Sequence, residues 1–63
     1  MEKTTYTAWA GNEEGASTNV ANGEEFTSIN NAAAAARAEF AEGWTIHIVD
    51  QNGSEVKSFT IRK

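Results

Sequence analysis

The fold is decided by residues 44–61, WTIHIVDQNGSEVKSFTI. Apolar residues alternate with other residues from Trp44 to Val49, and again towards Ile61, which is typical of half-buried strands. Asn52-Gly53 lies between the two runs and is a strong hairpin signal, because a type I′ turn needs positive φ at both central residues. The stretch therefore predicts a β-hairpin.

The length of the hairpin loop sets which side chains share a face. A two-residue loop places the large apolar side chains on one face, whereas a three-residue loop would move Phe59 to the opposite face from Ile46. We therefore expect the two-residue loop. It pairs Val49 with Val56, Ile46 with Phe59, and Trp44 with Ile61.

Two strands and a helix are expected before this hairpin. Residues 3–10 are rich in threonine and aromatic residues, which favours a strand starting at Lys3. Residues 16–21 predict a short polar strand at a sheet edge, with Val20 as its large apolar residue. The helix is expected from Ile29 to about Glu42, with Thr27 or Ser28 as N-cap and Gly43 as its stop.

The resulting order is strand, strand, helix, strand, strand. It predicts an α+β fold: one domain over residues 1–63, with two layers and one helix packed on a four-stranded sheet. A right-handed crossover is expected to place a strand of the second hairpin parallel to a strand of the first.

Three short segments resemble the immunoglobulin-binding β-grasp domains of the protein G and protein L type. They are Thr5-Tyr6 at the first strand, Gly43-Trp44-Thr45 after the helix, and residues 57–61, KSFTI, at the end. The resemblance implies a β-grasp-like ββαββ fold whose first and last strands form a central parallel pair. It also implies immunoglobulin binding, with Trp44 as the matching contact residue.

Composition narrows the partners and the compartment. The 63 residues contain no cysteine and carry a net charge of −4. Nucleic-acid binding is not expected, because a nucleic-acid binder shows a basic face. No metal or cofactor motif, signal peptide or membrane-spanning run is found. A cytoplasmic protein is expected, with surface or secreted locations left open.

His47 is the only histidine, and the expected register places it opposite Ser58. A serine–histidine pair suggests a nucleophile, but we expect no carboxylate to orient the ring. Asp50 and Glu55 are expected opposite each other beside the turn. We therefore predict no catalytic residues and no enzyme activity.

The expected function is protein–protein contact. Exposed Trp9 among threonine and valine side chains is typical of a contact surface, and acidic loops suit a basic partner. The candidate residues are Thr7, Trp9, Thr45, His47, Val49, Val56, Glu13, Glu14, Glu24 and Glu25. Three hypotheses remain open: a bacterial or phage accessory protein, including an acidic inhibitor of a nucleic-acid-handling machine; an immunoglobulin-binding domain; and a homodimeric structural protein.

Overall fold

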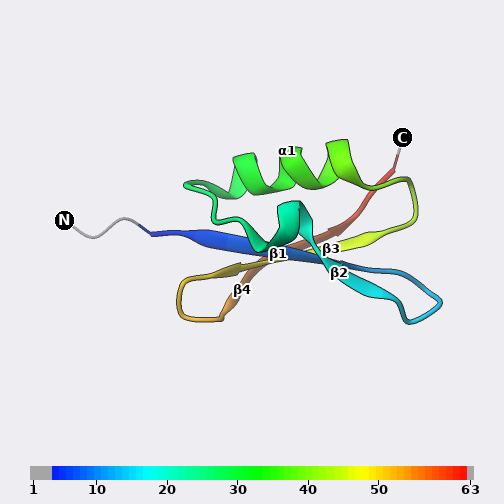
Figure 1. The fold of residues 1–63 in the computed structure, drawn as a ribbon, viewed down its shortest axis with the longest axis horizontal. Helices are drawn as coiled ribbons and strands as arrows, with labels where there is room; N and C mark the ends of the chain where they lie inside the picture. Colours follow the sequence, from blue (N-terminus) through cyan, green and yellow to red (C-terminus); the bar gives the residue numbers. More distant parts are fainter. Residues whose placement is uncertain (1–3, 63) are drawn as a thin grey trace.

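The computed structural model describes residues 4–62 and confirms the two-layer α+β architecture, with one helix on a four-stranded sheet (Figure 1). Its elements are β1 (Tyr6–Gly11), β2 (Ser17–Asn19), the 3₁₀ turn η1 (Val20–Gly23), α1 (Ile29–Glu39), β3 (Thr45–Asp50) and β4 (Glu55–Thr60). The expected start of the first strand at Lys3 lies outside the described residues.

All neighbouring strands are antiparallel, in the order β2-β1-β3-β4. The expected parallel pair of first and last strands is therefore wrong: β3 lies beside β1, and β4 forms an edge. Burial explains the difference. Ile46 and Ile48 of β3 have no exposed surface, so the centre of the sheet suits β3 best. Lys57 in β4 remains exposed at the edge, where charge also blocks unwanted strand pairing.

The core lies between α1 and the two central strands. Small side chains face each other across the two layers, which lets the helix approach the sheet closely. They are Ala32, Ala33 and Ala36 of α1 and Ala8 and Ala10 of β1, all buried. The largest fully buried side chains are those of Val20, Ile46, Ile48 and Ile61, and partly buried aromatic side chains pack around them.

The N-cap of α1 is Ser28, whose Oγ accepts a hydrogen bond from the Asn31 amide at 3.0 Å. This confirms the predicted start of the helix. The helix ends at Glu39, three residues before the predicted end at Glu42, because Phe40 already has an extended conformation. Gly43 has φ +102° and lies in the turn that leads into β3.

The hairpin loop contains three residues, 51–53, and the predicted type I′ turn is wrong. The Asp50 carbonyl accepts from the Gly53 amide, and the Asp50 amide donates to the Ser54 carbonyl, both at 2.9 Å. Gly53 has φ +85°, whereas the only described non-glycine residues with positive φ are Ala21 and Asn22. Asn52 therefore keeps negative φ. This is a turn followed by a left-handed glycine, the common three-residue hairpin loop.

A β-bulge at Val56 cancels the shift that this loop introduces. Val49 lies opposite Glu55, but Ile48 lies opposite Lys57, so Val56 is an extra residue in β4. Beyond the bulge, Ile46 lies opposite Phe59, as predicted. The expected pairing of Val49 with Val56 is wrong, although the predicted apolar pairing in the core is confirmed.

β2 is a short edge strand, as predicted, but it ends at Asn19 rather than Ala21. The chain then turns so that Val20 enters the core with no exposed surface. Ala21, Asn22 and Gly23 follow with φ of 50°, 58° and 85°. The Ala21 amide donates to Glu39 Oε1 at 3.0 Å, which joins this left-handed turn to α1.

Candidate contact surface on the open face of the sheet

The side of the sheet away from α1 is not covered by another element among the described residues. We call it the open face. Paired residues of neighbouring strands share a face, so the strand register defines its members. They are Thr7, Trp9 and Gly11 of β1, Ser17 and Asn19 of β2, Thr45, His47 and Val49 of β3, and Glu55, Ser58 and Thr60 of β4.

Trp9 and His47 form the centre of the open face. They are paired residues of β1 and β3, and their rings stack with centroids 4.1 Å apart and planes inclined by 19°. Despite this stacking, Trp9 remains 39% exposed. Gly11 contributes by its size: a Cβ there would lie 3.4 Å from Trp9 Cζ3. The open face thus presents a large, fixed aromatic surface.

A carboxylate does orient the His47 ring, contrary to the sequence-based prediction. Glu55 Oε1 lies 2.6 Å from His47 Nδ1. The three-residue loop is the cause, because it places Glu55 opposite Val49 rather than opposite Asp50. Glu55 therefore joins the open face beside His47, where it fixes the ring against Trp9.

Ser58 lies opposite His47 on β4, as predicted. Serine, histidine and glutamate are thus neighbours on one face, which are the residue types of a nucleophile, its base and an orienting carboxylate. Catalysis also needs donors aimed at the developing negative charge. The amides of β3 cannot serve, because β3 pairs with strands on both sides.

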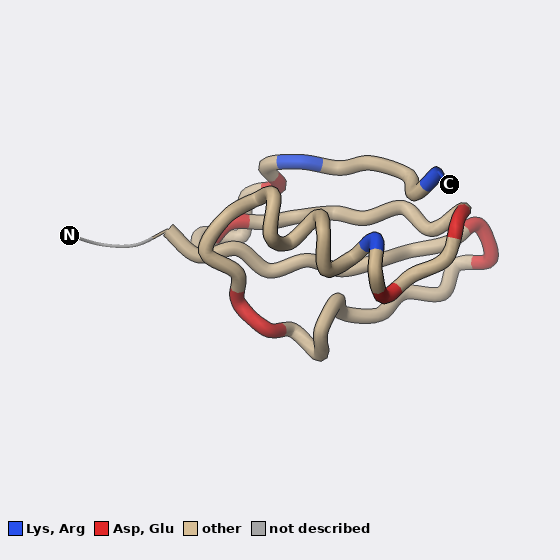
Figure 2. The backbone as a smooth tube through the Cα atoms, turned by 90° about the horizontal axis from the view of Figure 1, so that it is seen from above, with Lys and Arg blue, Asp and Glu red and all other residues tan. Residues whose placement is uncertain are grey.

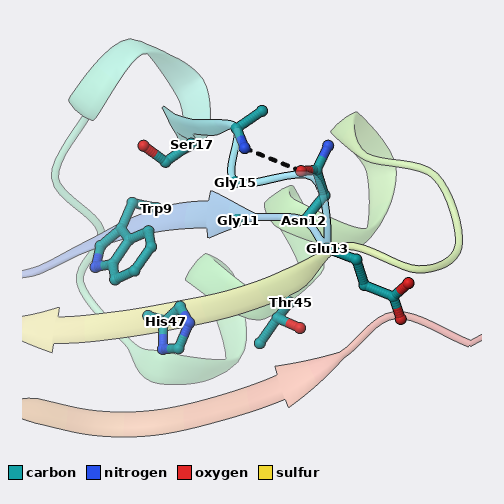
Figure 3. A pocket seen from close by; sticks show the side chains of 9 residues that line it. Trp9, Gly11, Asn12, Glu13, Gly15, Ser17, Thr45 and His47 are labelled. Carbon is teal, nitrogen blue, oxygen red and sulfur yellow. Dashed lines mark hydrogen bonds between the residues drawn. The ribbon is translucent and has the colours of Figure 1, made fainter.

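An open pocket of about 410 Å³ lies beside Trp9, between the sheet and the loop that joins β1 to β2 (Figure 3). Asn12 holds this loop, since its Oδ1 accepts from the amides of Glu14 and Ala16, each at 3.0 Å. The Glu13 side chain lines the pocket and extends away from the Trp9 ring. Ser17 and Thr45 complete its walls with hydroxyl groups.

The remaining candidate residues of the sheet lie around this centre. Thr7 is paired with Val49, and Thr45 Oγ1 lies 3.2 Å from Thr60 Oγ1. Val56 is 40% exposed, but it sits at the bulge of the edge strand rather than among the paired rows. Trp44, which the family resemblance singled out, is half-buried, and its ring centroid lies 5.2 Å from that of Phe40.

The four candidate glutamates separate into two pairs (Figure 2). Glu13 and Glu14 lie in the β1–β2 loop, whereas Glu24 and Glu25 lie beside the start of β1, where Thr5 Oγ1 donates to Glu25 at 3.0 Å. β1 contains six residues, so the pairs lie about 20 Å apart at about 3.3 Å per residue. One small basic site cannot contact both pairs.

Sequence reasoning missed several residues that build the site. Glu55 was missed because its position depends on the three-residue loop, which Asn52-Gly53 does not distinguish from a two-residue loop. Asn12 and Ser17 were not singled out, although residues 11–15, GNEEG, have the composition of a turn, where asparagine side chains commonly accept backbone hydrogen bonds.

Residues 4–62 contain no group of three or more histidine, cysteine or acidic side chains that would hold a metal ion. Within the same range, no helix combines the length and the apolar character needed to cross a membrane. Comparisons of the chain with protein-family models, curated proteins and solved structures found no match.

Proposed function

We propose that this chain is a non-enzymatic protein-binding module that contacts its partner through the open face. The observation that carries the proposal is the exposed Trp9 ring, held by His47 at the centre of an uncovered sheet. Tryptophan is enriched among the residues that dominate binding energy, particularly near the centre of an interface. A ring that is already fixed loses little conformational entropy on binding.

The side chains around Trp9 suit protein contact. Threonine, serine and asparagine surround the ring, a mixture of aromatic anchors and adaptable polar groups that also characterises antibody binding surfaces. Because Glu55 binds His47, the central polar groups are already oriented. The surface therefore combines a rigid apolar centre with a polar surround, which is the usual anatomy of an interface.

The partner proposed in more detail is a nucleic-acid-handling protein of a bacterium or phage, inhibited by the acidic loops. Since Glu13 and Glu14 lie about 20 Å from Glu24 and Glu25, at about 3.3 Å per residue along β1, this partner must offer a long basic surface. A short basic patch would meet one pair only. A second copy of the chain is the other occupant that the experiments below distinguish.

The test is affinity capture from bacterial lysate followed by mass spectrometry. Immobilised wild-type protein is compared with Trp9→Thr and with Val56→Thr, since Trp9 and Val56 are 39% and 40% exposed but only Trp9 lies at the centre. We expect a specific partner that Trp9→Thr loses and Val56→Thr retains. Equal capture by all three proteins would contradict the proposal.

Light scattering on the free protein tests whether a second copy of the chain occupies the open face. A monomer mass at all concentrations, together with Trp9-dependent capture, supports a foreign partner. A dimer that dissociates in Trp9→Thr but not in Val56→Thr would assign the open face to self-association instead.

A further inference from the structure

The charges of the described chain are distributed unequally between the two sides of the sheet. The eleven residues of the open face include Glu55 and neither lysine nor arginine. The basic side chains of the sheet and helix lie on the other side: the Arg37 guanidinium lies over Phe59, and Lys57 is paired with buried Ile48. The open face therefore offers a partner the Glu55 carboxylate and His47, but no lysine or arginine.

The Trp9 pocket adds a second acidic group to this surface. Glu13 lines its outer end. The two hydrogen bonds that Asn12 Oδ1 accepts from backbone amides hold the loop that carries Glu13 in place. His47 stacks against Trp9, while the pocket opens beside the ring towards Gly11 and Ser17. An incoming side chain thus meets an aromatic surface first and a carboxylate at the pocket rim.

We propose that the partner inserts an arginine or lysine side chain beside Trp9, so that a basic protein segment occupies the open face. This inference rests on the proposed function and names the chemistry of the partner. A cation over an indole ring is attracted by the ring quadrupole, and tryptophan is the best aromatic for this contact. The same distribution of charge disfavours a nucleic acid, whose phosphates are bound mainly by lysine and arginine side chains, and the open face has neither.

Long-range electrostatic attraction also favours a basic partner. The chain carries a net charge of −4, and Glu13 and Glu14 extend beyond one end of β1. Fields of this kind raise the rate at which a basic partner encounters the surface. Because exposed charges are screened over about 8 Å at physiological salt, the binding is expected to weaken as salt is added.

The test is an NMR titration of the ¹⁵N-labelled full chain, followed at the two indole Nε1–H signals. Trp9 reports on the open face, and Trp44, packed against Phe40 on the helix side, is the internal control. The probes are three blocked repeat peptides of equal length, Gly-Arg, Gly-Gln and Gly-Glu. We expect the Gly-Arg peptide to move the Trp9 signal saturably and at least about tenfold more tightly than Gly-Gln, a difference of about 1.4 kcal/mol.

Variants distinguish specific binding in the Trp9 pocket from nonspecific electrostatic attraction to the acidic chain. Glu13→Gln is expected to weaken Gly-Arg binding several-fold, whereas Glu24→Gln, the same substitution at the far end of β1, leaves it unchanged. Trp9→Thr abolishes binding measured at the His47 amide. If Glu13→Gln and Glu24→Gln weaken it equally, or Trp9→Thr has no effect, the attraction is general and the inference is overturned.

This outcome is distinguishable from failure of the proposed function. A captured protein that depends on Trp9, with no preference of Trp9 for the Gly-Arg peptide, would retain the open face as the contact surface and reject a basic partner. Capture that is independent of Trp9 would reject both.

Discussion

The Arg37 guanidinium lies 4.9 Å from the centroid of the Phe59 ring and connects the helix to the edge strand β4. α1 itself packs on β1, β3 and η1, so the side chain of Arg37 covers the apolar ring that the helix backbone does not reach. Phe59 is consequently half-buried rather than fully enclosed.

This geometry predicts the cost of two substitutions. Phe59→Ala is expected to lower the free energy of unfolding by about 2–3 kcal/mol, below the range for a fully buried phenylalanine. Arg37→Ala is expected to cost about 0.5–1 kcal/mol through the lost cation–π contact. Urea denaturation of both single variants and the double variant measures the coupling. Strictly additive effects would show that the contact contributes nothing.

The hairpin turn predicts unequal effects of the same substitution at neighbouring residues. Gly53 has positive φ and Asn52 does not, so Gly53→Ala is expected to cost about 1–2 kcal/mol, the usual penalty of a left-handed non-glycine residue. Asn52→Ala is expected to change stability by less than about 0.5 kcal/mol, as at an ordinary surface position. Thermal denaturation compares the two. A similar large loss at both would indicate a type I′ turn after all.

Ala21 offers a substitution that should stabilise the protein. It has φ 50°, which disfavours any residue with a Cβ, so Ala21→Gly is expected to raise the free energy of unfolding by about 0.5–1 kcal/mol. Ala34→Gly is the matched control, because an exposed helix interior loses about 1 kcal/mol with the same change. If both variants are destabilised, the left-handed turn at residues 21–23 is absent in solution.

The stacked pair on the open face predicts a measurable coupling. Trp9 and His47 should contribute about 0.5–1.5 kcal/mol beyond the area they bury, as aromatic pairs do. A double-mutant cycle with Trp9→Thr and His47→Thr measures this energy by chemical denaturation. In the same variants, loss of His47 should shift the Trp9 indole signal and leave Trp44 unchanged; no shift at Trp9 would contradict the stack.

Much of the fold follows from local patterns. Alternation in residues 44–49, the alanine-rich helix and the Ser28 cap are properties of short segments, and the structure confirms them. Strand order was not predictable in the same way, because the choice between β3 and β4 as the neighbour of β1 depends on the burial of Ile46 and Ile48 relative to Lys57. Two errors of register cancelled: the three-residue loop and the bulge at Val56 together preserve the Ile46–Phe59 pair.

For the same reason, the part of the candidate site that depends on strand alternation was predictable and the rest was not. Trp9, Thr45 and His47 face away from the helix because strand alternation requires it, so period-two reasoning was sufficient. Glu55 reaches His47 only through the irregular hairpin. The separation of the acidic pairs by the length of β1 is a property of the tertiary structure.

The most direct test of the central claim, that the open face is the contact surface, is site-specific photocrosslinking. A photoreactive phenylalanine derivative is introduced either at Ser58, exposed on the open face, or at Ala38, exposed on α1. We expect the Ser58 probe to capture a basic partner from lysate in a product that decreases with salt and disappears in Trp9→Thr, while the Ala38 probe captures none. Efficient capture of the same partner from Ala38, with nothing from Ser58, would contradict the account.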